Sequence, residues 1–160
     1  MRRFRLLSIA IVALVTTVVI VGGRHVEQRY LANRYAHDTS ELGQAFKWAR
    51  GVRRERVAVA GTAEQYPFYG VTLSNHVDYM GVEGPHGEFS EFRSCRAWRL
   101  ALARGRYRYV VAFPGVKSDP QQPPEAQWTR MDPSAREIVR AGRASVFRID
   151  GPVGTSGCPD

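Results

Sequence analysis

The aromatic stretch YPFYG at residues 66–70 is the part of this sequence best suited to bind a small molecule. Aromatic rings can stack on the C–H faces of a sugar, while polar side chains such as Asn75 bond its hydroxyl groups. The stretch follows a predicted strand, and ligands of open α/β sheets bind beyond the carboxyl ends of the strands. We therefore predict a sugar-binding site that includes Tyr66, Phe68, Tyr69 and Asn75. The alternative is that these rings cover the sheet edge or pack against a membrane-proximal helix.

Asp78 and His86 are the remaining candidate ligand residues, Asp78 within a predicted strand and His86 in the turn-rich segment 83–87. Together with Tyr66, a carboxylate and an imidazole would suit a small hydrolase or transferase. The alternatives are an Asp that faces solvent or bonds a loop backbone, and an ordinary surface His. An independent enzyme is therefore the second functional hypothesis.

Several other kinds of site are not indicated. The turn after the first predicted strand, residues 61–65, is neither a G-x-G-x-x-G nor a Walker loop, which argues against dinucleotide or ATP binding. The chain has no G-x-S-x-G nucleophile elbow, its histidines lack i, i+4 spacing, and its cysteines lack C-x-x-C spacing. We predict no catalytic residue for the chain alone, no metal site and no cofactor.

The N-terminal segment decides which solvent the rest of the chain meets. Residues 6–21 are sixteen consecutive uncharged residues, and Arg2, Arg3 and Arg5 precede them. At about 1.5 Å per residue this run approaches the thickness of a bilayer core, and basic residues favour the cytoplasmic flank. We predict a transmembrane anchor at residues 1–23 with a short cytoplasmic N-terminus, so that the chain crosses the cell membrane once. A cleaved signal peptide and a buried core helix are the alternatives.

The rest of the chain is predicted to form one extracytoplasmic domain. A helical linker at residues 24–38 leads into an α/β domain at residues 39–150, and residues 151–160 form an irregular tail. Asp38 is the expected cap of the first domain helix, and Asp132 caps a helix at residues 134–140. Strands are expected at residues 57–60, 76–82, 107–113 and 145–149, and further helices at residues 39–50 and 89–104, with a Pro-rich loop at residues 114–124. Helices that alternate with short apolar strands indicate a small, mostly parallel sheet in a three-layer α/β arrangement.

Charge and cysteine content fit this placement. The formal net charge is +8, and Lys47 and Lys117 are the only lysines, so that the basic residues are nearly all arginines. Outside the cytoplasm, such a charge suits anionic headgroups or a lipid-linked phosphate better than nucleic acid. The alternative is a solvated, Arg-rich surface that binds no ligand. Cys95 and Cys158 are the only cysteines. They would be able to pair and tie the tail to a helix, and two free thiols are the alternative.

The segments RVAVAGTAEQYPFYGVTLSNHVDYMG, PHGEF and CRAWRLALARGRYRYVVAFP carry a resemblance to a known family. They resemble the extracytoplasmic C-terminal domain of bacterial dolichyl-phosphate-mannose–protein mannosyltransferase-like enzymes, which are C-type membrane glycosyltransferases. In those proteins the last membrane helix leads into a small α/β domain through a linker similar to NRYA at residues 33–36. The resemblance covers nearly the whole chain, from the anchor to Cys158.

This chain also departs from that family, because it has one expected membrane helix where such enzymes have about a dozen. Their catalytic acidic residue lies in an early loop that has no counterpart here. The resemblance therefore implies a detached terminal domain of a cell-envelope glycosyltransferase system, non-catalytic by itself: a split-gene partner, an accessory subunit or a truncated remnant. Its implied partners are membrane lipid, a polytopic transferase subunit or a polyprenyl-phosphate sugar. A carbohydrate-binding module is the remaining hypothesis.

Overall fold

The computed structural model describes residues 2–87, 89–115 and 121–159. Residues 116–120 of the predicted Pro-rich loop, with Lys117, lie outside the described residues. The fold is mixed α/β and carries one apolar N-terminal helix.

Five strands form one mixed sheet in the order β2-β1-β5-β7-β6. Their bounds are β1 (Arg56–Ala60), β2 (His76–Tyr79), β5 (Tyr109–Ala112), β6 (Ala135–Ala141) and β7 (Ala144–Ile149). Strand β1 is parallel to both β2 and β5, and Val57 pairs with Val77 on one side and Tyr109 on the other. Strand β7 is antiparallel to both β5 and β6. A mostly parallel sheet is therefore not what the structure shows.

The difference arises because residues 135–141 form strand β6 and not the predicted helix. Asp132 does not cap a helix here, since its Oδ1 accepts hydrogen bonds from the backbone N–H and the hydroxyl of Ser134 in a local turn. Strand β6 then pairs with β7 through a tight hairpin at Gly142, where φ is +56°. A positive φ costs glycine little, so the turn is available to this sequence. Hairpin strands run antiparallel, which makes this half of the sheet antiparallel.

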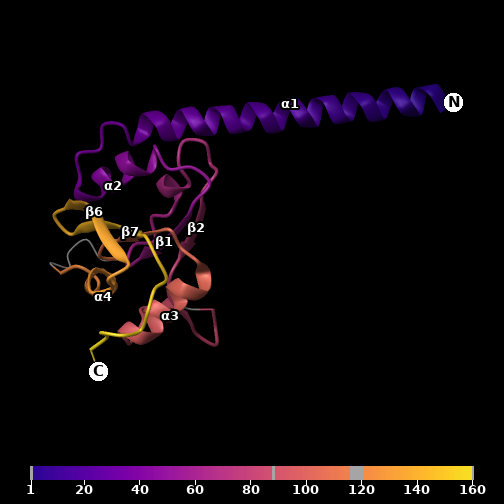
Figure 1. The fold of residues 1–160 in the computed structure, drawn as a ribbon. Helices are drawn as coiled ribbons and strands as arrows, with labels where there is room; N and C mark the ends of the chain where they lie inside the picture. The colour runs from indigo at the N-terminus through magenta and orange to yellow at the C-terminus, as the bar shows by residue number, and fades with distance from the viewer. Residues whose placement is uncertain (1, 88, 116–120, 160) are drawn as a thin grey trace.

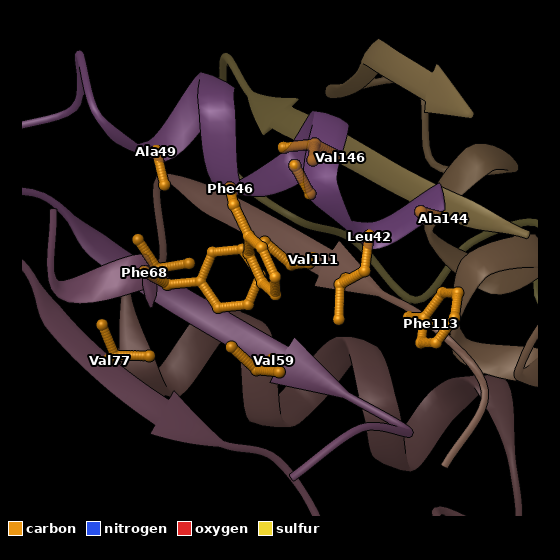
Figure 2. Close-up of a cluster of buried hydrophobic side chains, with 12 residues drawn as sticks. Leu42, Phe46, Ala49, Val59, Phe68, Val77, Val111, Phe113, Ala144 and Val146 are labelled. Atoms are coloured by element: carbon orange, nitrogen blue, oxygen red, sulfur yellow. The ribbon is translucent and has the colours of Figure 1, made fainter. Parts of the chain in front are cut away.

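Both faces of the sheet are covered by helices. Alternate strand residues point to opposite faces, so Val59, Val111 and Val146 face one side while Ala58, Val110 and Phe147 face the other. Helix α2 (Glu41–Ala49) and the short 3-10 helix η1 (Tyr66–Tyr69) cover the first face, shown in Figure 2. Helices α3 (Cys95–Gly105) and α4 (Pro124–Arg130) cover the second face. Burial on both sides explains why β1 and β5 are continuous apolar runs.

Serine caps fix where the domain helices begin. The Ser40 Oγ accepts a hydrogen bond from the backbone N–H of Gly43, so Ser40 rather than Asp38 is the cap of α2. The Ser94 Oγ accepts in the same way from Ala97 at the start of α3. Helix α3 therefore starts later than predicted, and the chain before it forms a small hairpin of β3 (Val82–Glu83) and β4 (Phe89–Ser90). A serine side chain that satisfies a free N–H sets a helix start more sharply than apolar spacing does.

Helix α1 (Arg2–Arg34) is a single rod of 33 residues that projects away from the domain (Figure 1). Within it, the segment Ile9–Tyr30 is long and apolar enough to cross a membrane, with a mean hydropathy of 2.0. Its apolar side chains do not pack on the domain, because the large ones from Ile9 to Val21 are more than half exposed. The helix has no core role in the described structure, which argues against a buried core helix.

The C-terminal tail, residues 151–159, is held on α3 at the end of the domain away from α1 (Figure 1). A disulfide joins Cys95 to Cys158, with 5.5 Å between their Cα atoms. Next to it, the fully buried guanidinium of Arg99 donates hydrogen bonds to the backbone carbonyls of Gly154, Ser156 and Trp128. The tail is irregular in conformation but fixed in position.

Candidate functional site

A cleft lies between the end of α1, α2 and the loop that contains η1. Its volume is about 830 Å³. It is lined by Tyr35, His37, Asp38, Phe46, Ala63, Glu64, Gln65, Tyr66, Pro67 and Tyr69. The lining therefore combines aromatic rings and polar side chains around one open space.

The cleft is joined to the apolar helix by one hydrogen bond. The Tyr66 hydroxyl donates to the Glu27 carboxylate of α1. This hydrogen bond is the main reason that the pKa of Tyr66 rises to about 12, and partial loss of solvent and the Glu27 charge add to the effect. Glu27 lies three residues before Tyr30, the last residue of the apolar segment, which is about 4.5 Å along the axis at about 1.5 Å per residue. The cleft consequently opens close to the end of the apolar segment.

The aromatic wall of the cleft is built on the core. The Phe46 ring of α2 contacts Tyr35 at 4.8 Å and Phe68 at 5.5 Å between ring centroids. Figure 2 shows the Phe46 and Phe68 rings side by side. Tyr66 and Tyr69 sit at the two ends of η1, with 6.5 Å between ring centroids. A buried Phe pair thus supports two more accessible Tyr rings, whose positions follow from the short helix.

The polar lining is acidic rather than basic. Asp38 and Glu64 contribute carboxylates, Gln65 an amide and His37 an imidazole. The Asp38 Oδ1 also accepts from the backbone N–H of Ser40, so this side chain is held in place. Carboxylates accept hydrogen bonds from sugar hydroxyls, and amides both accept and donate them. The carboxylates also repel an anionic ligand. The lining therefore suits a neutral, hydroxyl-rich ligand.

A second hollow continues the cleft along α2. It has a volume of about 480 Å³ and shares Asp38, Phe46 and Glu64 with the first. Its far end is the ion pair between Glu41 and Arg143, 2.8 Å apart.

The structure brings two of the six predicted ligand residues, Tyr66 and Tyr69, into this cleft. Phe68 lies next to them in sequence but is fully buried in the core. Asn75 is also buried and serves as a clamp: its side-chain amide donates to the carbonyls of Val52 and Phe68, and its Oδ1 accepts from the N–H of Glu55. Both residues position the η1 loop from behind.

Asp78 and His86 lie elsewhere. The Asp78 carboxylate accepts from the Tyr107 hydroxyl at 2.7 Å and pairs with Arg56 at 3.2 Å and His76 at 3.1 Å. Burial, followed by the hydrogen bond to Asp78, raises the pKa of Tyr107 to about 12. His86 is exposed in the turn between β3 and β4. Neither residue lines the cleft with Tyr66, so these three do not form one site.

Sequence reasoning missed most of the polar lining, above all His37, Asp38 and Glu64. The sequence predicts Asp38 only as a helix cap, whereas its Oδ1 accepts from the backbone N–H of Ser40 and the residue lines the cleft. The other two reach the cleft through long-range packing of the linker against the η1 loop. Among the described residues, no group of three or more His, Cys, Asp and Glu side chains is arranged to hold a metal ion.

No protein-family model matches the chain, and no match was found among curated proteins or among solved structures.

Proposed function

We propose that this chain is a membrane-anchored, extracytoplasmic domain that holds the sugar part of a lipid-linked glycan at the membrane surface. It would act as a non-catalytic accessory in cell-envelope glycosylation, which is the role implied by the resemblance to the terminal domain of C-type glycosyltransferases. In this proposal α1 crosses the membrane once, with its N-terminus in the cytoplasm. The basic residues before the apolar segment and the disulfide between Cys95 and Cys158 support that orientation.

One observation carries the proposal: the tyrosine-lined cleft opens beside the end of the apolar helix and is joined to it through Tyr66 and Glu27. A sugar attached to a lipid headgroup would lie at this level. The rings offer stacking surfaces, and the acidic and amide groups offer partners for neutral hydroxyls. The phosphate of such a ligand does not fit an acidic lining and would lie outside the cleft.

An independent enzyme is the less supported reading. The acid–base candidates Asp78 and His86 do not share the cleft with the aromatic residues, and Asp78 is already occupied by a Tyr, an Arg and a His. Binding of a sugar without catalysis needs only the aromatic rings and the hydrogen-bonding side chains that line the cleft.

We expect Tyr69→Ala to weaken binding of a neutral oligosaccharide about tenfold. Loss of about 60 Å² of ring contact at about 25 cal/mol per Å² corresponds to about 1.5 kcal/mol. The measurement is binding of the purified full chain, in neutral detergent, to an array of neutral and anionic oligosaccharides. Tyr69→Phe keeps the ring and serves as the matched control, with affinity close to that of the original chain.

Two results would overturn the proposal. One is absence of binding to every neutral oligosaccharide on the array. The other is equal affinity of the Tyr69→Ala and original chains, since the cleft would then not be the binding site. Thermal melting of each variant shows whether a loss of affinity reflects loss of folding.

A further inference from the structure

A separate basic pocket lies where the chain before β1 meets the loop before β2. It has a volume of about 520 Å³ and is lined by Arg53, Arg54, Thr72 and Ser74. Both arginines are exposed. Neither guanidinium has an ion-pair partner among the residues that the structure describes, in contrast to Arg56, which pairs with Asp78.

The pocket is held in shape by hydrogen bonds from both sides. The backbone N–H of Arg54 donates to the Ser74 Oγ at 3.1 Å, and the Thr72 and Ser74 hydroxyls are 2.8 Å apart. Behind them, the buried Asn75 side chain joins the two segments through Val52 and Glu55. Asn75, which the sequence predicts as a ligand residue, thus fixes the two walls of this pocket.

The backbone at Arg54 is unusual for its residue type. Its φ is +57°, and Leu73 across the pocket has φ +52°. Glycine and asparagine adopt this left-handed conformation more readily than arginine or leucine do. Arg54 therefore keeps a backbone conformation that its residue type does not favour.

Two guanidinium groups and two hydroxyls are the groups that proteins use to bind phosphate oxygens. Guanidinium groups form short, charge-assisted hydrogen bonds to phosphate, and hydroxyls add neutral donors. The aromatic cleft lacks this chemistry because its lining is acidic. The two sites consequently suit different ligands.

One wall of the pocket belongs to the stretch of chain that contacts the membrane anchor. Its Thr72 and Ser74 follow η1 directly, and η1 is bonded to Glu27 of α1. Figure 1 shows the chain between β1 and β2 reaching α1, on the side of the domain toward which the helix extends. With α1 in a membrane, this side meets the headgroups.

We propose that the basic pocket of Arg53, Arg54, Thr72 and Ser74 binds the phosphate of an anionic membrane phospholipid and so holds the domain against the membrane surface. The proposal uses the membrane placement of the proposed function but not the sugar specificity of the cleft. If Tyr69→Ala left sugar binding unchanged, the proposed function would be contradicted but this proposal would not, because Tyr69 does not line the basic pocket.

The test is calorimetric titration of the full chain, in neutral detergent micelles, with three probes: short-chain phosphatidylglycerol, phosphatidylcholine of equal chain length, and inorganic phosphate. We expect phosphatidylglycerol to bind at least about tenfold more tightly than phosphatidylcholine. Each of Arg53→Gln and Arg54→Asn should weaken phosphatidylglycerol about fivefold, the effect of one basic residue near an anionic surface. Asn tolerates the left-handed backbone at position 54, so this variant should fold. Arg104→Gln is the matched control, because it also removes one positive charge but lies at an exposed position of α3. This variant should leave the affinity unchanged.

Equal affinities for the two lipids would overturn the proposal, as would arginine variants that bind like the original chain. Inorganic phosphate that binds as tightly as phosphatidylglycerol would assign the pocket to a soluble phosphate and not to a lipid. If Arg54→Asn melts at a lower temperature than the original chain, the affinity of Arg53→Gln alone tests the proposal, because the backbone at position 53 does not have a positive φ.

Discussion

Arg99→Met should lower the free energy of unfolding by about 3–5 kcal/mol, the usual cost of removing one partner from a buried ion pair. Arg99 has no exposed surface, and its Nη1 lies 3.5 Å from the buried carboxylate of Asp132. Methionine fills similar volume but leaves this carboxylate without its countercharge. It also leaves the carbonyls of Trp128, Gly154 and Ser156 without their donor. Unfolding of the full chain by urea, followed by far-UV circular dichroism, measures the loss.

Two variants separate the ion pair from simple packing. Arg96→Met removes an exposed arginine from the same helix and should change stability by less than about 0.5 kcal/mol. The double variant Arg99→Met with Asp132→Asn should recover part of the loss, because no buried charge then lacks a partner. A loss of less than about 1 kcal/mol in the Arg99→Met chain would contradict a stabilising role of the buried pair between Arg99 and Asp132.

Cys158→Ser should cost about 4 kcal/mol in unfolding free energy. The disulfide closes a loop with a sequence separation of 63 residues, and cross-linking such a loop restricts the unfolded chain by about that amount in the chain-entropy model. Cys95→Ser should cost the same, and reduction of the original chain should bring its stability to that of both variants. Urea unfolding with and without dithiothreitol provides the comparison.

Reduction without effect on stability, or free alkylation of both thiols before reduction, would show that the pairing is absent. The disulfide and Arg99 hold the same tail, so their effects should not add. Without the disulfide, more conformational entropy is lost when the carbonyls of Gly154 and Ser156 are held in place. Arg99→Met should therefore lower the unfolding free energy less in the Cys158→Ser chain than in the cross-linked chain.

The apolar helix, the central strands and α2 could be predicted because their signals are local. Sixteen uncharged residues require a long helix or a membrane, and the short apolar run around Val57 is typical of a strand that is buried on both faces. Strand β6 was mistaken for a helix because AREIVRA is rich in residues that favour helices. Pairing with β7 outweighed that preference, and pairing depends on a partner that lies beyond the hairpin.

The candidate site was predictable only in its aromatic half. Tyr66 and Tyr69 stand out as an aromatic cluster after a strand, but Phe68 between them turns inward to Phe46 of α2. Nothing in a local window distinguishes the three rings. The clamp role of Asn75 and the basic pocket that it shapes depend on contacts across 20 or more residues, such as the bond from Glu55 to Asn75.

Placement of the domain outside the cytoplasm, on a helix embedded in the membrane, is the claim on which both binding proposals depend. Treatment of intact spheroplasts with a protease that cannot cross the membrane tests it directly, with a tag on the C-terminus and a cytoplasmic protein as the integrity control. We predict that the tag is lost before lysis and that the chain resists extraction by carbonate. A tag that survives until the spheroplasts are lysed, or a chain that carbonate releases, would contradict this placement.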